Sequence, residues 1–165
     1  MNVIREAQPA NFVAERIKKS ASLVINGNIR NVFPLFGPVR EAEWEAGWEP
    51  EIIYSENGLV EERMIFQSPG HLGEGKYTWV ITQFDPEKKL IEYTVSAITR
   101  IWFVRVICEE VGDKTRATVS YTYTGLTEEG NRMNKQALEK MFAHNLKDWE
   151  EAINYYLKTG KQLSH

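Results

Sequence analysis

Apolar and polar residues alternate with a period of two through most of residues 51–124, in runs separated by turn residues. This pattern is typical of antiparallel strands joined by short links. It predicts strands at residues 51–55, 59–67, 76–84, 90–98, 100–110 and 115–124, and a further strand-like run covers residues 13–25. The links leave no room for the crossover helices of a parallel sheet. The pattern therefore indicates a curved antiparallel sheet of seven strands.

After Leu126 the hydrophobic period changes to 3.6, which predicts one long helix over residues 127–158. Thr127 suits the cap of this helix and Gly160 suits its end. One face of the helix carries Leu138, Phe142, Leu146, Trp149, Ile153 and Tyr156. Such a stripe needs a broad apolar surface to cover it, and the strands provide the surface available. We therefore expect the helix to lie across the concave face of the sheet.

Residues 29–47 predict two short helices, interrupted at Pro34 and at the Gly37-Pro38 break. The 165 residues contain no repeat, low-complexity tract or linker, so residues 1–165 are expected to form a single domain. The predicted fold class is α+β with the helix-grip arrangement. In it, a seven-stranded sheet wraps around a long C-terminal helix, and two short helices lie between the first two strands.

Composition narrows the possible partners. A net charge of −3 disfavours nucleic-acid binding, which usually needs a basic surface. No apolar run is long enough to span a bilayer, and residues 1–20 do not resemble a secretory signal, so we expect a cytoplasmic protein without integral membrane association. The one cysteine, Cys108, lies in a predicted strand and suits a small buried side chain better than a nucleophile. Monomer and homodimer both remain open.

The order of elements resembles that of the START/Bet v 1-like superfamily, also called SRPBCC or polyketide cyclase/dehydrase-like proteins. Several strings are similar to a bacterial-type branch of it: residues 32–41 followed by Trp44 and Trp48, residues 79–81, residues 121–126 and residues 156–160. The resemblance covers residues 16–160. It implies the helix-grip fold, with functions that range from carriers of lipids and hormones to polyketide cyclases and co-chaperone-like domains, so it implies no particular reaction.

No catalytic or metal-binding signature is visible. His71, His144 and His165 lack the spacing of metal ligands, and no nucleophile elbow is present. The glycines of residues 70–75 stand in the wrong order for a dinucleotide-binding loop and fit a flexible hairpin connection. We therefore expect no cofactor and no metal, and we leave catalysis open.

Aromatic and polar residues expected to face the long helix form the candidate ligand site. The candidate contacts are Trp44, Trp48, Phe66, Tyr77, Trp79, Tyr121, Tyr123, Met141, Asn145, Trp149, Arg40 and Glu41. Strand alternation places Tyr77 with Trp79 on one face, and Tyr121 with Tyr123. The alternative is that these rings simply fill the core. A sheet wrapped around one helix, however, tends to leave a hollow.

Three polar positions refine this hypothesis. Asn145 falls within the apolar stripe, so its amide needs a neighbour, a water or a ligand. Arg40 and Glu41 are implied by the resemblance to lie at the cavity mouth, where Arg40 either meets a ligand carboxylate or pairs with a glutamate on the surface. Whether Arg100 or Arg105 faces inward is not decided by the sequence.

The leading functional hypothesis is the binding of a small hydrophobic or aromatic molecule, lipid-like or polyketide-like, in a cavity between the sheet and the C-terminal helix. A cyclase- or dehydratase-type enzyme using the same cavity is the second, and it requires an inward acid or base. A co-chaperone-like interaction domain that acts through its surface is the third.

Overall fold

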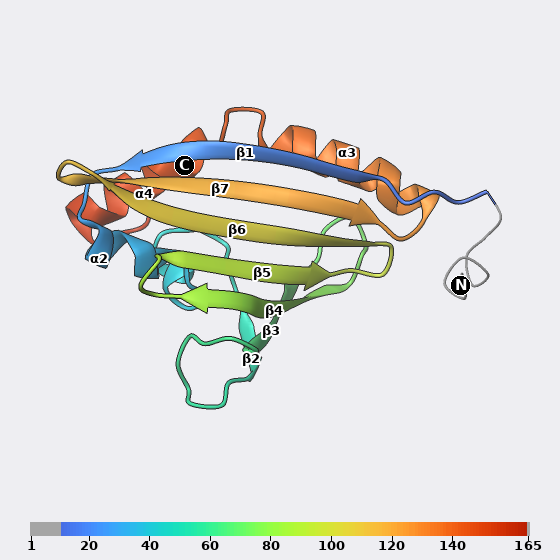
Figure 1. Cartoon of the computed structure of the whole chain (residues 1–165), viewed down its shortest axis with the longest axis horizontal. Coiled ribbons are helices and arrows are strands. Elements are labelled where there is room, and N and C mark those ends of the chain that lie inside the picture. The colour runs from blue at the N-terminus through green and yellow to red at the C-terminus, as the bar shows by residue number, and fades with distance from the viewer. Residues whose placement is uncertain (1–10, 165) are drawn as a thin grey trace.

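The computed structural model describes residues 11–164, which form one sheet and the helices that cover it (Figure 1). The strands are β1 (Arg16–Ile25), β2 (Glu51–Tyr54), β3 (Ile65–Pro69), β4 (Lys76–Asp85), β5 (Leu90–Ser96), β6 (Arg100–Val111) and β7 (Lys114–Gly125). All neighbours pair antiparallel in the order β1-β7-β6-β5-β4-β3-β2. This confirms the predicted seven-stranded antiparallel sheet.

Short helices follow β1, and two longer ones follow β7. They are α2 (Ile29–Val32), the 3-10 turns η1 (Phe33–Phe36) and η2 (Arg40–Glu43), α3 (Glu128–Met141) and α4 (Lys147–Thr159). Figure 1 shows α3 and α4 following one another along the β1 side of the sheet. The side chain of Asn28 accepts a hydrogen bond from the Asn31 amide and so caps α2. The helix-grip fold class predicted from the sequence is confirmed.

Burial alternates along the central strands as the period-two pattern predicts. In β6 and β7, every second residue is buried until the strands reach the Val111 turn. The strand predicted at residues 59–67 is shorter, because Glu61 holds residues 55–61 as a loop. Its carboxylate accepts hydrogen bonds from Ser55 and from both the backbone and the side chain of Asn57. The strand therefore begins only at Ile65.

The C-terminal helix is interrupted, whereas the sequence predicted a continuous one over residues 127–158. The α3 helix ends at Met141 and α4 begins at Lys147. Between them, Asn145 and Leu146 adopt left-handed backbone angles, with φ of 52° and 59°. A helix cannot continue through such residues. The break allows Leu146, which is 1% exposed, to enter the core.

The first turn of α3 is held against the β5–β6 turn. The Leu126 amide donates to the Thr99 carbonyl at 2.8 Å, and Gly130 lies so close to Thr99 that a Cβ there would stand 1.9 Å from the same oxygen. Only glycine allows this approach. On the other side, Asn131 bonds the backbone of Val13 and Glu15. Thus the start of α3 is fixed before the helix crosses the sheet.

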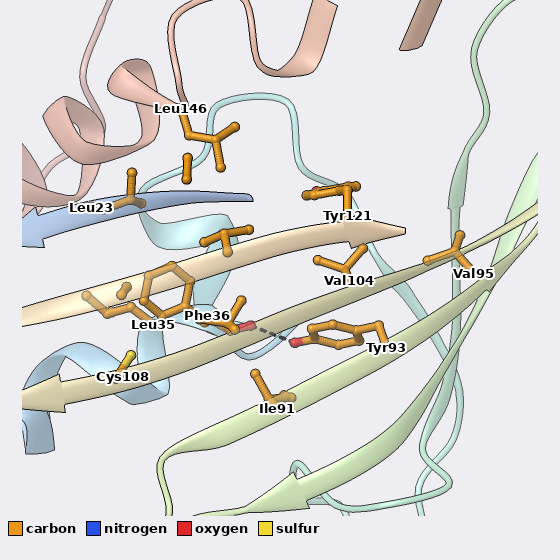
Figure 2. Close-up of a cluster of buried hydrophobic side chains, with 14 of the residues drawn as sticks. Leu23, Leu35, Phe36, Ile91, Tyr93, Val95, Val104, Cys108, Tyr121 and Leu146 are labelled. Carbon is orange, nitrogen blue, oxygen red and sulfur yellow. Dashed lines mark hydrogen bonds between the residues drawn. The ribbon is translucent and has the colours of Figure 1, made fainter. Parts of the chain in front are cut away.

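The core lies between the concave face of the sheet and the helices. Its largest fully buried side chains include Trp44, Phe66, Leu23, Ile25, Leu35, Ile81, Ile91, Leu146 and Ile153. Figure 2 shows part of this cluster, with the Tyr93 hydroxyl donating to the Phe36 carbonyl at 2.6 Å. Cys108 is buried here as expected, and burial raises the pKa of its thiol to about 12.

Candidate functional site

A set of aromatic rings lies on the inner sheet face, and its members contact one another in two groups: Phe66 with Trp79 and Tyr93, and Tyr77 with Trp102, Tyr123 and Tyr121. We call it the aromatic wall; its members are Phe66, Tyr77, Trp79, Tyr93, Trp102, Tyr121 and Tyr123. Strand alternation brings them together, since each occupies an inward position of β3, β4, β5, β6 or β7. Centroids of neighbouring rings lie between 4.9 Å for Tyr77 with Trp102 and 6.0 Å for Tyr121 with Tyr123.

Most indole donors near the wall are satisfied by the protein itself. Trp44 donates to the Leu35 carbonyl at 2.8 Å, and Trp48 donates to the Pro38 carbonyl at 2.7 Å. The Trp79 indole donates to a serine hydroxyl on β3 at 2.9 Å. These three predicted contacts thus have structural roles whether or not a ligand binds. Trp149 adds an edge-to-face contact with Trp44 at 5.7 Å.

The cover over the wall comes from α3 and from the break that follows it. Leu138 and Phe142 are buried against the wall, and Met141 is half-buried beside them. The prediction that Asn145 lies on the buried face is wrong. The left-handed turn at the end of α3 rotates its side chain into solvent, so a position that a continuous helix would have placed inside is exposed.

Glu41 is an acidic group close to the wall. Burial, with the charge of Glu45 as a lesser cause, raises the pKa of Glu41 well above its usual range. In turn, the pKa values of Tyr93 and Tyr121 are raised well above their usual range, first by burial and then by neighbours that include Glu41. The charge of Glu41 is therefore felt by both tyrosines, and its contact with a ligand stays a prediction.

Glu45 is a second acid that the sequence did not reveal. Burial raises its pKa to about 7, and the charge of Asp148 adds to the effect. It lies one turn beyond Glu41, whose carbonyl accepts a hydrogen bond from the Glu45 amide at 2.8 Å. A carboxyl with a pKa near neutral pH, as Glu45 has, is suited to exchange protons with a bound molecule.

The hydroxyl of Tyr121 and the carboxyl of Glu41 have no hydrogen-bond partner among residues 11–164. Within the same described part of the chain, the only completely sealed side-chain polar atom that lacks a partner is Nδ2 of Asn134. The oxygens of Tyr121 and Glu41 are therefore not sealed, and a water or a ligand atom can reach them.

At the end of the wall nearest the start of α3, Arg100 is buried and points inward, whereas Arg105 is exposed on the outer face. The Nε and Nη2 atoms of Arg100 donate hydrogen bonds to the two carboxylate oxygens of Glu74, at 2.9 and 2.6 Å. Both side chains are under a tenth exposed. The Arg100 charge and hydrogen bonds from Arg100 and Tyr77 lower the pKa of Glu74, although burial opposes them as the largest single influence. Glu74 is thus an ionised partner of Arg100.

Rings surround the Arg100 guanidinium. Its Cζ lies 4.6 Å from the Trp102 centroid, 5.6 Å from that of Tyr123 and 5.9 Å from that of Tyr77. The Tyr77 hydroxyl donates to Glu74 and accepts from Nη2 of Arg100 at 3.1 Å. Burial raises the pKa of Tyr123 to about 12, with the Arg100 charge opposing the rise. The aromatic wall therefore ends in a buried cation.

Arg40 lies outside the interior. It is exposed and pairs with Glu43 at 2.7 Å, and this bond raises the pKa of Arg40 and lowers that of Glu43. The Tyr156 hydroxyl donates to the same carboxylate at 2.7 Å, which ties η2 to α4. The structure thus shows the surface pair that was the alternative for Arg40.

Two hollows in the described surface lie away from the wall. One, of about 230 Å³, is on the outer sheet face and is lined by Lys18, Glu92, Phe103, Arg105, Ser120 and Thr122. The other, of about 340 Å³, lies beside the first turn of α3, where Glu128 and Arg132 line it. Within residues 11–164 no group of acidic, histidine and cysteine side chains could hold a metal ion, and no helix is long and apolar enough to cross a membrane.

Sequence reasoning missed Glu74, Asn134 and Glu45, and it left open whether Arg100 or Arg105 faces inward. Arg100 could have been placed, because alternation with Trp102 puts it on the inner face. Asn134 could have been placed as well, since it precedes Leu138 by one helical turn. The buried position of Glu74 could not have been predicted, because nothing in the sequence of the glycine-rich loop indicates which of its side chains turns inward.

Several solved structures share this fold. Norcoclaurine synthase from Thalictrum flavum aligns over 89% of this chain and 88% of its own, with a TM-score of 0.63 and 15% identity. Major latex-like protein 151 from Panax ginseng aligns over 79% of this chain and 98% of its own, with a TM-score of 0.56 and 16% identity.

A protein from Rhizobium leguminosarum described as putative and uncharacterized aligns over 88% of this chain and 97% of its own, with a TM-score of 0.55 and 12% identity. No protein-family profile and no curated protein matches the sequence. At these identities the likeness concerns the fold alone. The chain has the Bet v 1-like, or SRPBCC, fold.

Proposed function

We propose that this protein binds a small hydrophobic or aromatic molecule between the aromatic wall and α3. The observation that carries the proposal is the pair of unsealed, unpartnered oxygens on Tyr121 and Glu41, set among buried rings. A tyrosine hydroxyl without a protein partner adds nothing to a core that serves only for stability, whereas it can bond a polar atom of a bound molecule. A ligand with one polar group and an apolar body suits such a surface.

The break between α3 and α4 supports this proposal, because it is a point at which the cover over the wall could move. Asn145 and Leu146 hold left-handed angles at the point where one helix gives way to the next. Such residues can act as a hinge when the segment on one side moves. A ligand would enter as α3 lifts from the wall and Phe142 turns aside. The cytoplasmic location and the choice between monomer and homodimer stay predictions.

Titration calorimetry with 2-ethylnaphthalene tests the proposal, and the expected result is saturable binding with one molecule per chain. Ala137→Phe places a ring between α3 and the core, so we expect it to abolish binding while circular dichroism stays unchanged. Gln136→Phe adds the same ring on the exposed side of α3 and is the matched control, which should bind as the parent does. Equal binding by both variants would place the ligand elsewhere.

A second candidate, a cyclase- or dehydratase-type enzyme, is favoured by one observation, the raised pKa of Glu41 beside Tyr93 and Tyr121. In its ionised form, a carboxylate whose pKa is raised is a stronger base than usual, and it can take a proton from the carbon next to a carbonyl group and return it. Nuclear magnetic resonance would follow exchange of the methyl protons of 2-acetonaphthalene for deuterium. Acceleration by the protein that Glu41→Gln removes, without loss of binding, would support catalysis. Exchange at the buffer rate would leave only the carrier function.

A further inference from the structure

Asn134, on the buried face of α3, has a donor that the protein does not use. The side chain is 1% exposed, and its Oδ1 accepts from Nη1 of Arg100 at 3.4 Å. Since Nη1 can only donate, it fixes which end of the amide is the oxygen. The Nδ2 group then points away from Arg100 and has no partner among the described residues. An unpartnered donor of this kind is costly, and because it is sealed here, a ligand oxygen would reach it only as α3 moves away from the wall.

A second donor with unused capacity lies close to this amide. Nε and Nη2 of Arg100 are engaged by Glu74 and Tyr77, but Nη1 makes only the long 3.4 Å contact with Asn134. The Tyr123 ring lies 5.6 Å from the guanidinium, and its hydroxyl is close enough to Arg100 for a hydrogen bond with that side chain to oppose the rise in the Tyr123 pKa. Two donors with unused capacity, Nη1 of Arg100 and Nδ2 of Asn134, thus lie at the end of an apolar aromatic surface. They therefore suit an oxygen that accepts hydrogen bonds.

The charges of Arg100 and Glu74 decide which kind of ligand oxygen can bind beside them. Arg100 is the only basic side chain buried within residues 11–164, and Glu74 already grips it with two hydrogen bonds. The pair is neutral as a unit, so a carboxylate brought beside it would be a buried charge without a counter-ion, which is strongly unfavourable. A neutral carbonyl oxygen can accept from Arg100 and Asn134 with no such penalty.

We propose that Nη1 of Arg100 and Nδ2 of Asn134 form a subsite for the carbonyl oxygen of a neutral aromatic ketone, ester or amide. The proposal rests on the proposed ligand-binding function and names the class of ligand. Glu74 is a positioning residue, because it holds the guanidinium with Nη1 directed at α3. Gly70 allows the loop to return over Arg100, since a Cβ there would stand 1.8 Å from the Gly75 carbonyl oxygen.

Three probes of one shape test the subsite: 2-acetonaphthalene carries a ketone, 2-ethylnaphthalene lacks the oxygen, and 2-naphthoate carries a charge. Calorimetry of the wild-type chain should show the ketone binding about tenfold tighter than the hydrocarbon, the gain typical of satisfying a buried donor. The carboxylate should bind most weakly. The carbonyl stretch of the bound ketone should move to lower frequency, which a purely structural role for Asn134 would not cause.

Substitutions on α3 test whether Asn134 causes the preference for the ketone and the infrared shift. Asn134→Leu and Asn134→Asp both remove the Nδ2 donor, and the aspartate keeps an acceptor for Arg100. Each should abolish the tenfold preference and the infrared shift while still binding 2-ethylnaphthalene. Gln136→Leu, on the exposed side of the same helix, should retain both.

The possible failures are distinct. Equal affinity for ketone and hydrocarbon in the wild-type chain would overturn the carbonyl subsite and leave the apolar site standing. Tightest binding of 2-naphthoate would overturn it in favour of an anion that displaces Glu74. If none of the three probes binds, the proposed function fails, and the subsite fails with it.

Discussion

The inner face of the sheet has two halves that differ in chemistry. Under α3 lies the aromatic wall with Arg100 at its end, and we call this the aromatic half. Under α2, η1 and α4 lie small and branched aliphatic side chains, which we call the aliphatic half. The aliphatic half includes Leu23, Ile25, Val32, Leu35, Ile91, Val106, Ala117, Val119 and Ile153, each no more than 2% exposed.

Polar groups are treated differently in the two halves. At the aliphatic half, polar side chains serve the backbone: Glu150 accepts from the Val24 amide at 2.9 Å, and Asn154 bonds both Asn26 and the Val24 carbonyl. These contacts dock α4 onto the edge strand β1. In the aromatic half, Asn134 and Tyr121 retain unused hydrogen-bonding capacity. The comparison teaches that the protein satisfies the polar groups of the aliphatic half itself, whereas the aromatic half keeps unused hydrogen-bonding capacity, as the proposed binding site requires.

Breaking the ion pair of the aromatic half should have the largest effect on stability. Arg100→Leu leaves the buried Glu74 carboxylate without its cation, so we expect a loss of about 3–5 kcal/mol in the free energy of unfolding at neutral pH, measured by urea denaturation. The double variant Arg100→Leu with Glu74→Gln removes both charges and should recover much of that loss. A double variant as unstable as the single one would show that packing, and not charge, decides.

Truncating a side chain of the aliphatic half should lower the free energy of unfolding slightly less. Ile153 is fully buried on α4, and Ile153→Ala removes three carbons there, which should lower the free energy of unfolding by about 2–4 kcal/mol. Ligand affinity of the folded protein should stay unchanged, because this side chain belongs to the aliphatic half. A matched change, Tyr121→Phe, removes only an unpartnered hydroxyl and should leave stability nearly constant while altering affinity. The reverse outcome would exchange the roles of the two halves.

The sequence predicted the alternation of the strands well and the polar contacts of the aromatic half only in part. Period-two alternation is a local property, so the inward positions of the strands followed directly. The break at Asn145 did not, because asparagine occurs both within helices and at left-handed positions, and the choice here is made by the burial of Leu146. Likewise, the partner of Arg100 comes from a loop 26 residues away, a pairing that no local pattern encodes.

The raised pKa of Glu45 makes the free energy of unfolding depend on pH. Glu45 has a pKa of about 7 in the folded chain, above its unfolded value, so the folded state holds its proton more tightly. Stability from this group is fully present below the unfolded pKa and declines as pH rises toward 7. Because Glu45 is partly accessible to solvent, the decline should be modest, about 1 kcal/mol.

Thermal melts of the wild-type chain and of Glu45→Gln between pH 4.5 and 8 measure this decline, and the variant should show a flatter curve. Glu74 acts in the opposite direction, since its lowered pKa removes stability as pH falls. A variant curve that runs parallel to that of the wild type would mean that Glu45 titrates like an exposed carboxylate.

The smallest effect is expected at Arg40, which lies outside both halves. Its bond with Glu43 is exposed to solvent on both sides, with about two fifths of each side chain accessible, and pairs of this kind contribute about 0–0.5 kcal/mol. Arg40→Ala should therefore change neither the melting temperature nor the affinity for 2-acetonaphthalene beyond error. Tyr156→Phe, which removes the other bond to Glu43, is the matched change and should be equally mild. A clear loss of ketone affinity in Arg40→Ala alone would extend the binding site to η2 and revive the predicted ligand contact of this arginine.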